Sequence, residues 1–294
     1  MKYILEQLGD ETLILRGSPP TLVRVKDNAA YIVDPGFGKE RGTSLRKLLD
    51  NLGVEEITVI LTHSHNDHIQ ATPYLKASHV YAPLIELPMI HYSKIRNYFS
   101  YGYMFTKGLS LLEGEDIVSC KPIESRKSYG GFIPIKLPGH TFGHYGILTE
   151  DDVLYVSDAL FGDKLLTKVG IPYVEDHTSF LETLDKIIDF SKMTKVVVLG
   201  HGPRISNWKI LRKIIDLNKE RIRNIEHDVL EYLSDSFMHI EELVSKLLIK
   251  YGVEVDLTSL LLSKPLIKSI ISKYYREGKL KPSYYNGFLK WKVK

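Results

Sequence analysis

Residues 56–68 read EITVILTHSHNDH, an apolar run that ends abruptly in a cluster of polar side chains. The apolar part, residues 56–62, predicts a buried strand. The polar part holds three imidazoles and one carboxylate between residues 63 and 68. Because open α/β sheets bind their ligands at the carboxyl ends of strands, the sequence predicts a ligand site at the end of this strand.

The order of the polar residues in this segment suits metal ions. His63 and His65 are two positions apart, so in extended chain their side chains point the same way and can bind one cation. The turn that follows directs Asp67 and His68 toward a second cation. The segment therefore predicts a site for two metal ions.

Three single polar residues elsewhere share this kind of position. His140, Asp158 and His201 each stand where an apolar, strand-like run ends. A lone histidine at a strand end is more often hydrogen-bonded structure than a metal ligand. Because these three residues share the strand-end position of the histidine-rich segment, all three are candidate ligands.

The surrounding pattern predicts sheets covered by helices. Alternating apolar residues predict strands, antiparallel at the start of the chain, at 2–8, 11–16, 20–26, 29–34, 131–137, 144–149, 152–157 and 195–200. One helix is predicted to begin at Thr43 or Ser44 and to end at Gly53. Another is predicted over 180–190, with Ser179 and Glu182 as its capping box.

After Pro203 the apolar spacing changes to that of helices. The pattern predicts a helix around 222–233, further helices near 239–251 and 262–277, and a hairpin that turns at 284–287. This order of three helices and a ribbon resembles a winged helix. We therefore expect a catalytic domain over residues 1–218 and a small winged-helix-like domain over residues 219–294.

Five motifs in a fixed order resemble the metallo-β-lactamase superfamily. They are Asp34-Pro35-Gly36, the 63–68 segment, Gly139-His140-Thr141-Phe142-Gly143-His144, Ser157-Asp158 and Gly200-His201-Gly202. Ser157 departs from the pattern, since relatives often have glycine there, but it replaces no metal ligand. The resemblance covers about residues 1–205 and implies an α/β fold, the αββα sandwich, with two sheets between layers of helices. Residues 219–294 more loosely resemble the winged-helix extension of lactamase-β-like hydrolases.

The resemblance also implies the ligand set. By it, His63, His65 and His140 bind a first metal, Asp67, His68 and His201 bind a second, and Asp158 bridges the two. Asp67 and Asp158 are also expected to be catalytic.

Two nearby residues have weaker assignments. His144 is grouped with the catalytic residues because it orients a ligand or helps to bind substrate; the other interpretation is ordinary hydrogen-bonded structure. Asp34 is expected to fix a turn or to orient a histidine rather than to bind metal.

Charge counting indicates the chemistry of such a site. Two divalent cations, two carboxylates and a shared hydroxide leave a net charge of about +1 among neutral imidazoles, which favours anionic transition states. Nitrogen and oxygen ligands without thiolate suit zinc first. The expected reaction is hydrolysis, in which the bridging hydroxide attacks the carbonyl of a small ester, thioester or lactone. A glyoxalase-type thioesterase shares the metal motif, but the sequence offers no convincing counterpart of its glutathione-binding basic cluster.

Basic charge is concentrated at the end of the chain. Residues 264–294 carry nine lysine and arginine residues and the single acidic residue Glu277, a local net charge of +8. Aromatic residues interleave these cations, which suits contacts to phosphates and bases. The alternative function is therefore a metal-dependent endoribonuclease or phosphodiesterase that holds single-stranded RNA or DNA through residues 264–294. The opposing interpretation is that the lysines are solvated and the aromatic residues form core or a homodimer contact.

Composition excludes several classes of protein. Hydrophobic residues make up 44% and charged residues 26% of the chain, which excludes a disordered protein. A single cysteine, Cys120, excludes an intramolecular disulfide and a cysteine-ligated zinc site. The first residues lack the apolar run of a signal peptide, and no segment approaches the roughly 18 apolar residues of a membrane span. We therefore expect a cytoplasmic protein without membrane contact.

Residues 92–105 crowd aromatic side chains around Gly102 and lack a clean period. Two interpretations stay open for this segment. It is either a lid over the site or a loop whose aromatic side chains pack underneath it.

Overall fold

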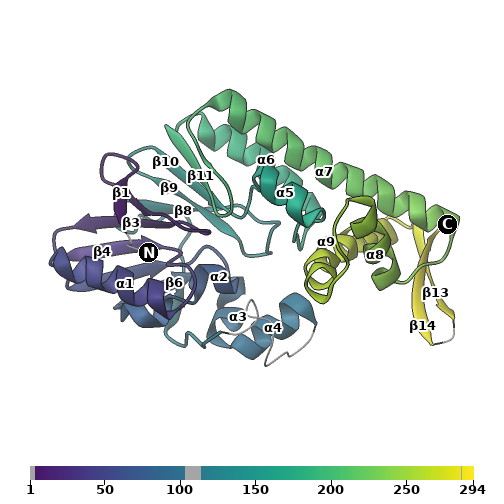
Figure 1. Ribbon diagram of the computed structural model, residues 1–294, viewed down its shortest axis with the longest axis horizontal. Helices are drawn as coiled ribbons and strands as arrows, with labels where there is room; N and C mark the ends of the chain where they lie inside the picture. Colours follow the sequence, from purple (N-terminus) through teal and green to yellow (C-terminus); the bar gives the residue numbers. More distant parts are fainter. Residues whose placement is uncertain (1–3, 103–113, 286) are drawn as a thin grey trace.

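The structure, a computed structural model, describes residues 4–102, 114–285 and 287–294. Two sheets pack face to face, with helices on both outer faces, so the sequence-based prediction of an αββα sandwich is confirmed (Figure 1). A group of helices and a hairpin extends from one end of the sandwich and contains the C-terminus.

The first sheet has its strands in chain order. Within the described residues these are β1 (Leu5–Gln7), β2 (Leu13–Leu15), β3 (Thr21–Lys26), β4 (Ala29–Val33), β5 (Glu56–Ile60), β6 (His79–Ala82) and β7 (Cys120–Pro122). The strands from β1 to β4 are antiparallel, as predicted, and those from β4 to β7 are parallel. Helix α1 (Lys39–Asn51) makes the crossover between β4 and β5 that a parallel pair requires.

The second sheet has the order β12-β11-β10-β9-β8 in the described part of the chain. Its strands are β8 (Phe132–Lys136), β9 (Tyr145–Thr149), β10 (Val153–Ser157), β11 (Val196–Leu199) and β12 (Arg204–Ile205). Only β10 and β11 pair in parallel, and helices α5 (Asp163–Val169) and α6 (His177–Ser191) lie between them in the chain. The strand ends that follow β10 and β11 are therefore side by side.

The other elements surround this sandwich or extend from it. Short helices follow β5 and β6: α2 (Asn66–Ile69), η1 (Thr72–Leu75), η2 (Leu84–Glu86), α3 (Leu87–His91) and α4 (Ser93–Tyr101). The C-terminal part consists of α7 (Trp208–Asp235), α8 (Ile240–Lys250), α9 (Leu257–Arg276) and the hairpin of β13 (Leu280–Tyr285) and β14 (Phe288–Val293). Among the described helices, none has the length and apolar character that a membrane crossing needs.

Both faces of the central strands are buried, which explains their continuous apolar runs. In β10, Val153 and Tyr155 face the first sheet, whereas Leu154 and Val156 pack with the outer helices. Successive side chains of a strand point to opposite faces, so a sheet covered on both sides needs apolar residues at every position.

Three predicted helix starts are wrong, and each of these helices begins earlier; in addition, the helix predicted around 222–233 is only the second half of α7, which begins at Trp208. Helix α1 begins at Lys39 after Gly38, because the buried Arg41 side chain binds the carbonyl oxygens of Pro35 and Arg16 and so ties the first turn to the sheet. The predicted caps Thr43 and Ser44 therefore lie inside the helix.

Helices α6 and α9 also begin before their predicted first residues, each at a capping residue that the sequence analysis did not identify. Asp176, not Ser179, caps α6, and its side chain accepts hydrogen bonds from the backbone N–H groups of Thr178 and Ser179. Helix α9 begins at Leu257 with a capping box formed by Asp256 and Ser259.

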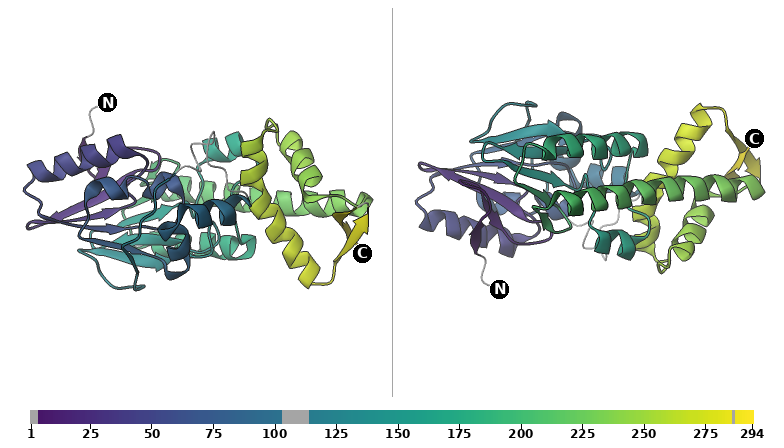
Figure 2. Two further views of the ribbon diagram at one scale, coloured as in Figure 1. Left: turned by 90° about the horizontal axis from the view of Figure 1, so that it is seen from below. Right: turned by 90° about the horizontal axis from the view of Figure 1, so that it is seen from above.

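Helix α7 runs unbroken through residues 218 and 219, where we expect the domain boundary. Figure 2 shows it extending along the sandwich and on to the C-terminal helices. One hydrophobic cluster continues from Leu154 of the second sheet to Leu243 of α8 and Ile270 of α9. The predicted order of three helices and a ribbon is confirmed, while the winged-helix character and the domain limits remain predictions.

The aromatic segment around Gly102 is described only in part. Its first residues form α4, and Gly102 ends that helix with a left-handed φ of 77°. Residues 103–105 of the segment lie outside the described residues, so the choice between a lid and a packed loop stays open.

A polar contact joins the C-terminal helices to the sandwich and generates a prediction on stability. The Glu226 carboxylate on α7 accepts hydrogen bonds from Lys273 (2.7 Å) and Tyr274 (3.0 Å) of α9 and lies 3.5 Å from His177 of α6. The contact with His177 has the largest effect on the pKa of Glu226 and outweighs burial, which acts in the opposite direction. The pKa is lowered from 4.5 to about 2. The carboxylate therefore stabilises the fold above pH 4.5, and this contribution is lost as the pH falls toward 2.

We predict that Glu226→Gln lowers the free energy of unfolding at pH 7 by about 1 kcal/mol, a value discounted for solvent screening. The difference from the unmodified protein should shrink when denaturation is measured at pH 3. Glu220→Gln, at an exposed position of the same helix, is the matched control and should change little. A deficit for Glu226→Gln that is the same at both pH values would contradict the ionic contribution.

Candidate metal centre

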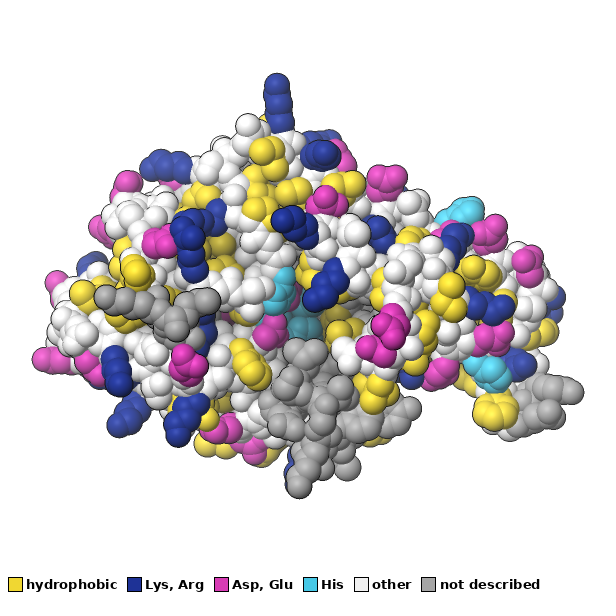
Figure 3. Space-filling model, viewed as in Figure 1, with side chains coloured by type: hydrophobic (Ala, Val, Ile, Leu, Met, Phe, Trp, Pro, Cys, Tyr) yellow, Lys and Arg dark blue, Asp and Glu magenta, His cyan; other side chains and the backbone are white. Residues whose placement is uncertain are grey.

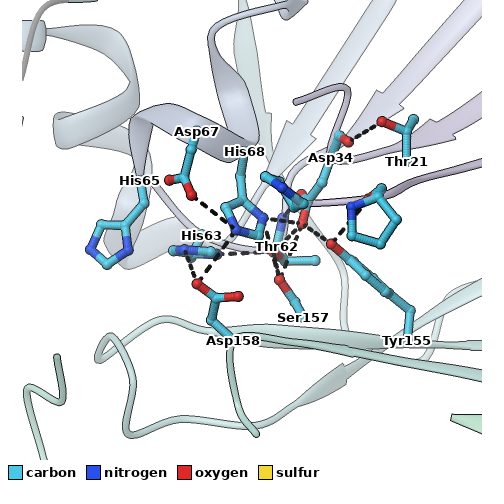
Figure 4. A network of polar contacts seen from close by, with 12 residues as sticks. Thr21, Asp34, Thr62, His63, His65, Asp67, His68, Tyr155, Ser157 and Asp158 are labelled. Carbon is cyan, nitrogen blue, oxygen red and sulfur yellow. Dashed lines mark hydrogen bonds and ion pairs between the residues drawn. The ribbon is translucent and has the colours of Figure 1, made fainter. Parts of the chain in front are cut away.

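The candidate ligands converge where strands of both sheets end. Figure 4 shows five of them: His63, His65, Asp67, His68 and Asp158. His63 and His65 follow β5, and His140 follows β8. Asp158 comes directly after β10, and His201 follows β11. The face-to-face packing of the sheets therefore joins residues that are far apart in the chain at one edge of the sandwich.

A first group consists of His63, His65, His140 and Asp158, whose potential ligand atoms all lie within 4.8 Å of one another. His65 Nδ1 is 2.9 Å from His140 Nε2. The Asp158 Oδ2 atom is 3.5 Å from His140 Nε2 and 4.0 Å from His63 Nε2. Three imidazole nitrogens and a carboxylate oxygen at this spacing match the four-coordinate sites that zinc prefers.

A second group consists of Asp67, His68 and His201. The Asp67 Oδ2 atom is 2.9 Å from His201 Nε2 and 3.9 Å from His68 Nε2. Asp158 Oδ2 also lies 3.5 Å from His68 Nε2 and 3.6 Å from His201 Nε2. One carboxylate oxygen is thus within 4.0 Å of a histidine nitrogen from each group, which is the placement of a bridging ligand.

Unpaired buried atoms test whether a cation fits here. His63 Nε2, His68 Nε2 and Asp158 Oδ1 are buried without a hydrogen-bond partner among the described residues. Buried polar atoms in folded proteins are nearly always paired, so this cluster needs a further partner. His63 Nε2 and His68 Nε2 both lie within 4.0 Å of Asp158 Oδ2, so nitrogen and oxygen donors are gathered here and a divalent metal fits the site.

Asp34 orients His68, as one interpretation of the sequence predicted. Its side chain is fully buried and accepts hydrogen bonds from Thr62 N (2.8 Å), Thr62 Oγ1 (2.7 Å), Tyr155 OH (3.1 Å) and Ser157 Oγ (3.2 Å). The Nδ1 atom of His68 is 2.8 Å from the same carboxylate (Figure 4). The contact makes Nδ1 the donor and turns Nε2 toward Asp158.

Three more of the candidate histidines are oriented in the same manner. His140 Nδ1 donates to the Tyr173 carbonyl oxygen at 2.9 Å, and His201 Nδ1 lies 2.8 Å from Ser18 Oγ. His63 Nδ1 lies 3.0 Å from Thr62 Oγ1. In each ring the opposite nitrogen, Nε2, is left for the centre of the site.

Burial and charge prepare these groups to bind metal. Burial lowers the pKa of His63 well below its ordinary value, and burial with the nearby His140 lowers the pKa of His65 to about 3, so both imidazoles are neutral. Burial opposes ionisation of Asp158, but the charges of His201 and His68 outweigh it and lower the pKa of its carboxyl well below the usual range. Neutral imidazoles and ionised carboxylates are the forms that coordinate a cation, so His63, His65 and Asp158 are already in those forms. Burial opposes protonation of His68 and His201, but the charge of Asp158 outweighs it and raises the pKa of both, so these two imidazoles would lose a proton when a metal binds.

Glu86 supports the site, although no sequence pattern indicated it. The fully buried carboxylate accepts hydrogen bonds from Ser64 N (3.2 Å), Ser64 Oγ (2.6 Å) and Gly143 N (2.9 Å). It therefore joins the segment of His63 and His65 to the loop of His140. Thr62, Tyr155 and Ser157 were likewise not predicted as supporting residues, because each looks like an ordinary strand residue in the sequence.

His144 lies beside the ligands without belonging to either ligand group of the described residues. It is buried, and its Nε2 atom accepts a hydrogen bond from the Asp158 backbone N–H at 3.3 Å. Its ring centroid is 4.9 Å from that of His63. These contacts favour the interpretation that His144 orients a ligand, and a part in catalysis stays a prediction.

Comparison with known proteins identifies relatives of this chain. The model of the metallo-beta-lactamase superfamily matches residues 14–201. Hydroxyacylglutathione hydrolase 1 of Vibrio vulnificus is 30% identical over 197 residues, which are 67% of this chain and 67% of that protein.

Solved structures share the fold over almost the whole chain. A beta-lactamase domain protein from Burkholderia ambifaria has a TM-score of 0.73 at 15% identity and covers 99% of this chain and 93% of its own. A metallo-beta-lactamase family protein from Thermus thermophilus has a TM-score of 0.68 at 17% identity and covers 100% and 99%. The C-terminal helices and hairpin therefore belong to an arrangement that occurs in other proteins.

The contacts of Asp34 predict its effect on metal binding. We expect Asp34→Asn to weaken the second metal position about 10- to 100-fold, because the amide replaces an acceptor oxygen by a donor and no longer orients His68. Competition with a chelator, followed by elemental analysis, measures this loss.

Asp151→Asn is the matched control for this variant. Asp151 is also a buried carboxylate that accepts hydrogen bonds from threonines, Thr12 and Thr149, but it lies outside both ligand groups. Its loss should lower stability and leave metal affinity unchanged. Equal loss of metal in both variants would show that Asp34 acts through the fold and not through His68.

Proposed function

The chain belongs to the metallo-β-lactamase superfamily and is a hydrolase, and we propose that it cleaves an ester, thioester or lactone bond at a two-metal centre. Of these three substrate classes, we propose a thioester first. The observation that carries the proposal is the position of Asp158 Oδ2, within 4.0 Å of Nε2 atoms from both ligand groups. That position suits a carboxylate shared by two cations.

We assign the ligands as the two groups divide them. The first metal would be held by His63, His65 and His140, and the second by Asp67, His68 and His201, with Asp158 available to both. Zinc is the preferred ion, because every ligand is an imidazole or a carboxylate and the first group offers four donor atoms. The metals, when bound, supply Lewis acidity and hydroxide at neutral pH.

The residues of the chain set the geometry for this chemistry. The Asp158 side chain is 5% exposed, so it is enclosed and serves to hold the centre together. The Asp67 side chain is 26% exposed. Burial opposes its ionisation, but the charge of His68 and the bond from His201 outweigh it and lower the pKa of its carboxyl to about 2, so it is ionised. The backbone N–H groups of Phe142 and Gly143 already donate to Glu175 and Glu86, so they are not available to substrate.

The thioester class has support beyond the metal ligands. Relatives named hydroxyacylglutathione hydrolase align with most of the catalytic part of this chain. Thioesters already stand among the substrates expected from the sequence, and only a glyoxalase-type enzyme is disfavoured for want of a basic cluster. The similarity to these relatives supports a thioester as the first substrate class to test.

Cleavage of nucleic acid remains the alternative prediction, and the contacts of the basic C-terminal region do not strengthen it. Lys264 pairs with Glu241 at 2.9 Å, Lys273 with Glu226 at 2.7 Å, and Lys279 with Glu277 at 2.7 Å. These ion pairs reduce the positive field that would attract phosphates. The predicted homodimer contact likewise stays untested.

A parallel assay of a thioester, a lactone, a phosphodiester and a short single-stranded RNA tests the proposal. We expect thioester turnover, close to two metals per chain by elemental analysis, and loss of at least about 100-fold in turnover for Asp158→Ala, beyond the loss typical of supporting residues. Asp163→Ala, an exposed position just after the site strand, is the matched control and should retain activity. Turnover of RNA alone, dependent on Asp158 and suppressed by salt, would replace this proposal by the nuclease.

A further inference from the structure

A cleft of about 830 Å³ lies between the metal-binding loops and α9. Its size is that of pockets that enclose small-molecule ligands. Tyr98 and Phe99 of α4 and Phe142 of the His140 loop line it from the sandwich, and one face of α9 lines it from the C-terminal part. Figure 1 shows α4 and α9 approaching each other on this side of the molecule.

The cleft lies beside the first group of metal ligands, although none of these ligands lines it. Tyr173 does line it, and the ring of Tyr173 is 4.7 Å from that of His65 and 5.5 Å from that of His140, measured between centroids. Helix α9 is held against this edge by Ser269, whose hydroxyl lies 2.8 Å from Nδ1 of His177. A molecule that fills the cleft and passes Tyr173 would therefore extend from α9 toward the metal centre.

A stripe of polar residues on α9 faces the cleft. Lys264, Lys268, Ser272 and Arg276 all line it and are four positions apart, so they lie on one face of the helix. From Lys264 to Arg276 the stripe is about 18 Å long. Figure 3 shows histidine side chains (cyan) near the centre of this face of the molecule, beside acidic and basic side chains.

Two of these cations are free to bind an anion. Lys264 pairs with Glu241, but among the described residues no ion pair joins Lys268 or Arg276 to a carboxylate.

The two acidic residues that line the cleft, Glu175 and Asp176, already accept hydrogen bonds from neighbouring residues. Glu175 accepts hydrogen bonds from Phe142 N and Tyr173 OH, and Asp176 caps α6. The cleft therefore has exposed positive charge along α9 and apolar aromatic surface opposite it.

We propose that this cleft binds the thiol part of an elongated acyl thioester, with an anionic group of that part held by Lys268 and Arg276. The inference rests on the proposed acyl hydrolysis. The acyl groups of small thioesters are short, whereas a ligand that reaches from the metals to Arg276 must extend along the stripe. The aromatic side chains of Tyr98, Phe99 and Phe142 contact the body of the thiol carrier. Phosphate and carboxylate are the two anions that suit a lysine and an arginine.

The test compares one acyl group carried by three thiols: uncharged N-acetylcysteamine, carboxylate-bearing glutathione and phosphate-bearing coenzyme A. We expect the full-length, metal-loaded protein to prefer one of the two anionic thioesters in kcat/KM, and the preferred one identifies the anion. The double variant Lys268→Gln/Arg276→Gln should raise KM for that thioester about tenfold, leave kcat nearly unchanged, and leave the neutral thioester unaffected.

The control variant Lys213→Gln/Arg223→Gln removes the same charge from exposed positions of α7 outside the cleft and should change neither KM. Equal turnover of the charged and neutral thioesters, unaltered by the cleft variant, would overturn the inference and leave the proposed function standing. If no thioester is hydrolysed, the proposed function fails. Calorimetry with glutathione and coenzyme A then tests whether the cleft binds an anionic thiol. Binding weakened only in the cleft variant supports an anion site, and equal or absent binding overturns it.

Discussion

The structure depends on holding carboxylates and imidazoles together in its interior. Asp34 and Asp158 are buried beside histidines that are themselves enclosed. Such a cluster is unfavourable unless each group has a partner, and the fold supplies these from strands of both sheets: Thr62, Tyr155 and Ser157 all donate to Asp34. The atoms left without partners face one another around Asp158, and this is what makes the centre a cation site.

The loops that carry the candidate ligands are held together by residues that no sequence pattern indicated. Glu86 fastens the His63 segment to the His140 loop, and its own short helix carries no recognisable motif. Glu175 does the same for Phe142, and burial together with Glu86 raises its pKa to about 8. Two carboxylates thus brace the loop that separates the metals from the cleft.

The C-terminal part completes the region around the site rather than standing apart from it. Helix α7 crosses the expected domain boundary, and the hydrophobic cluster under the second sheet continues into α8 and α9. The contact between Ser269 and His177 sets α9 against the chain that follows the His140 loop. The side of the site open to a ligand is therefore made jointly by the sandwich and the last helices.

The sequence by itself indicated most strands of the two sheets and the helices of the C-terminal part, because apolar periodicity is a local property of the chain, but it did not indicate β6, β7 or β12. The seven candidate ligands came from the His63–His68 spacing, from polar residues at strand ends and from the resemblance to the superfamily. The sequence misplaced the first turns of α1, α6 and α9, where tertiary contacts such as that of Arg41 and caps such as Asp176 decide the boundary. Only the tertiary structure decided that Asp158 lies between the two ligand groups, that Asp34 and Glu86 support them, and that α9 lines a cleft beside them. These depend on distances between residues remote in the chain, which local patterns do not encode.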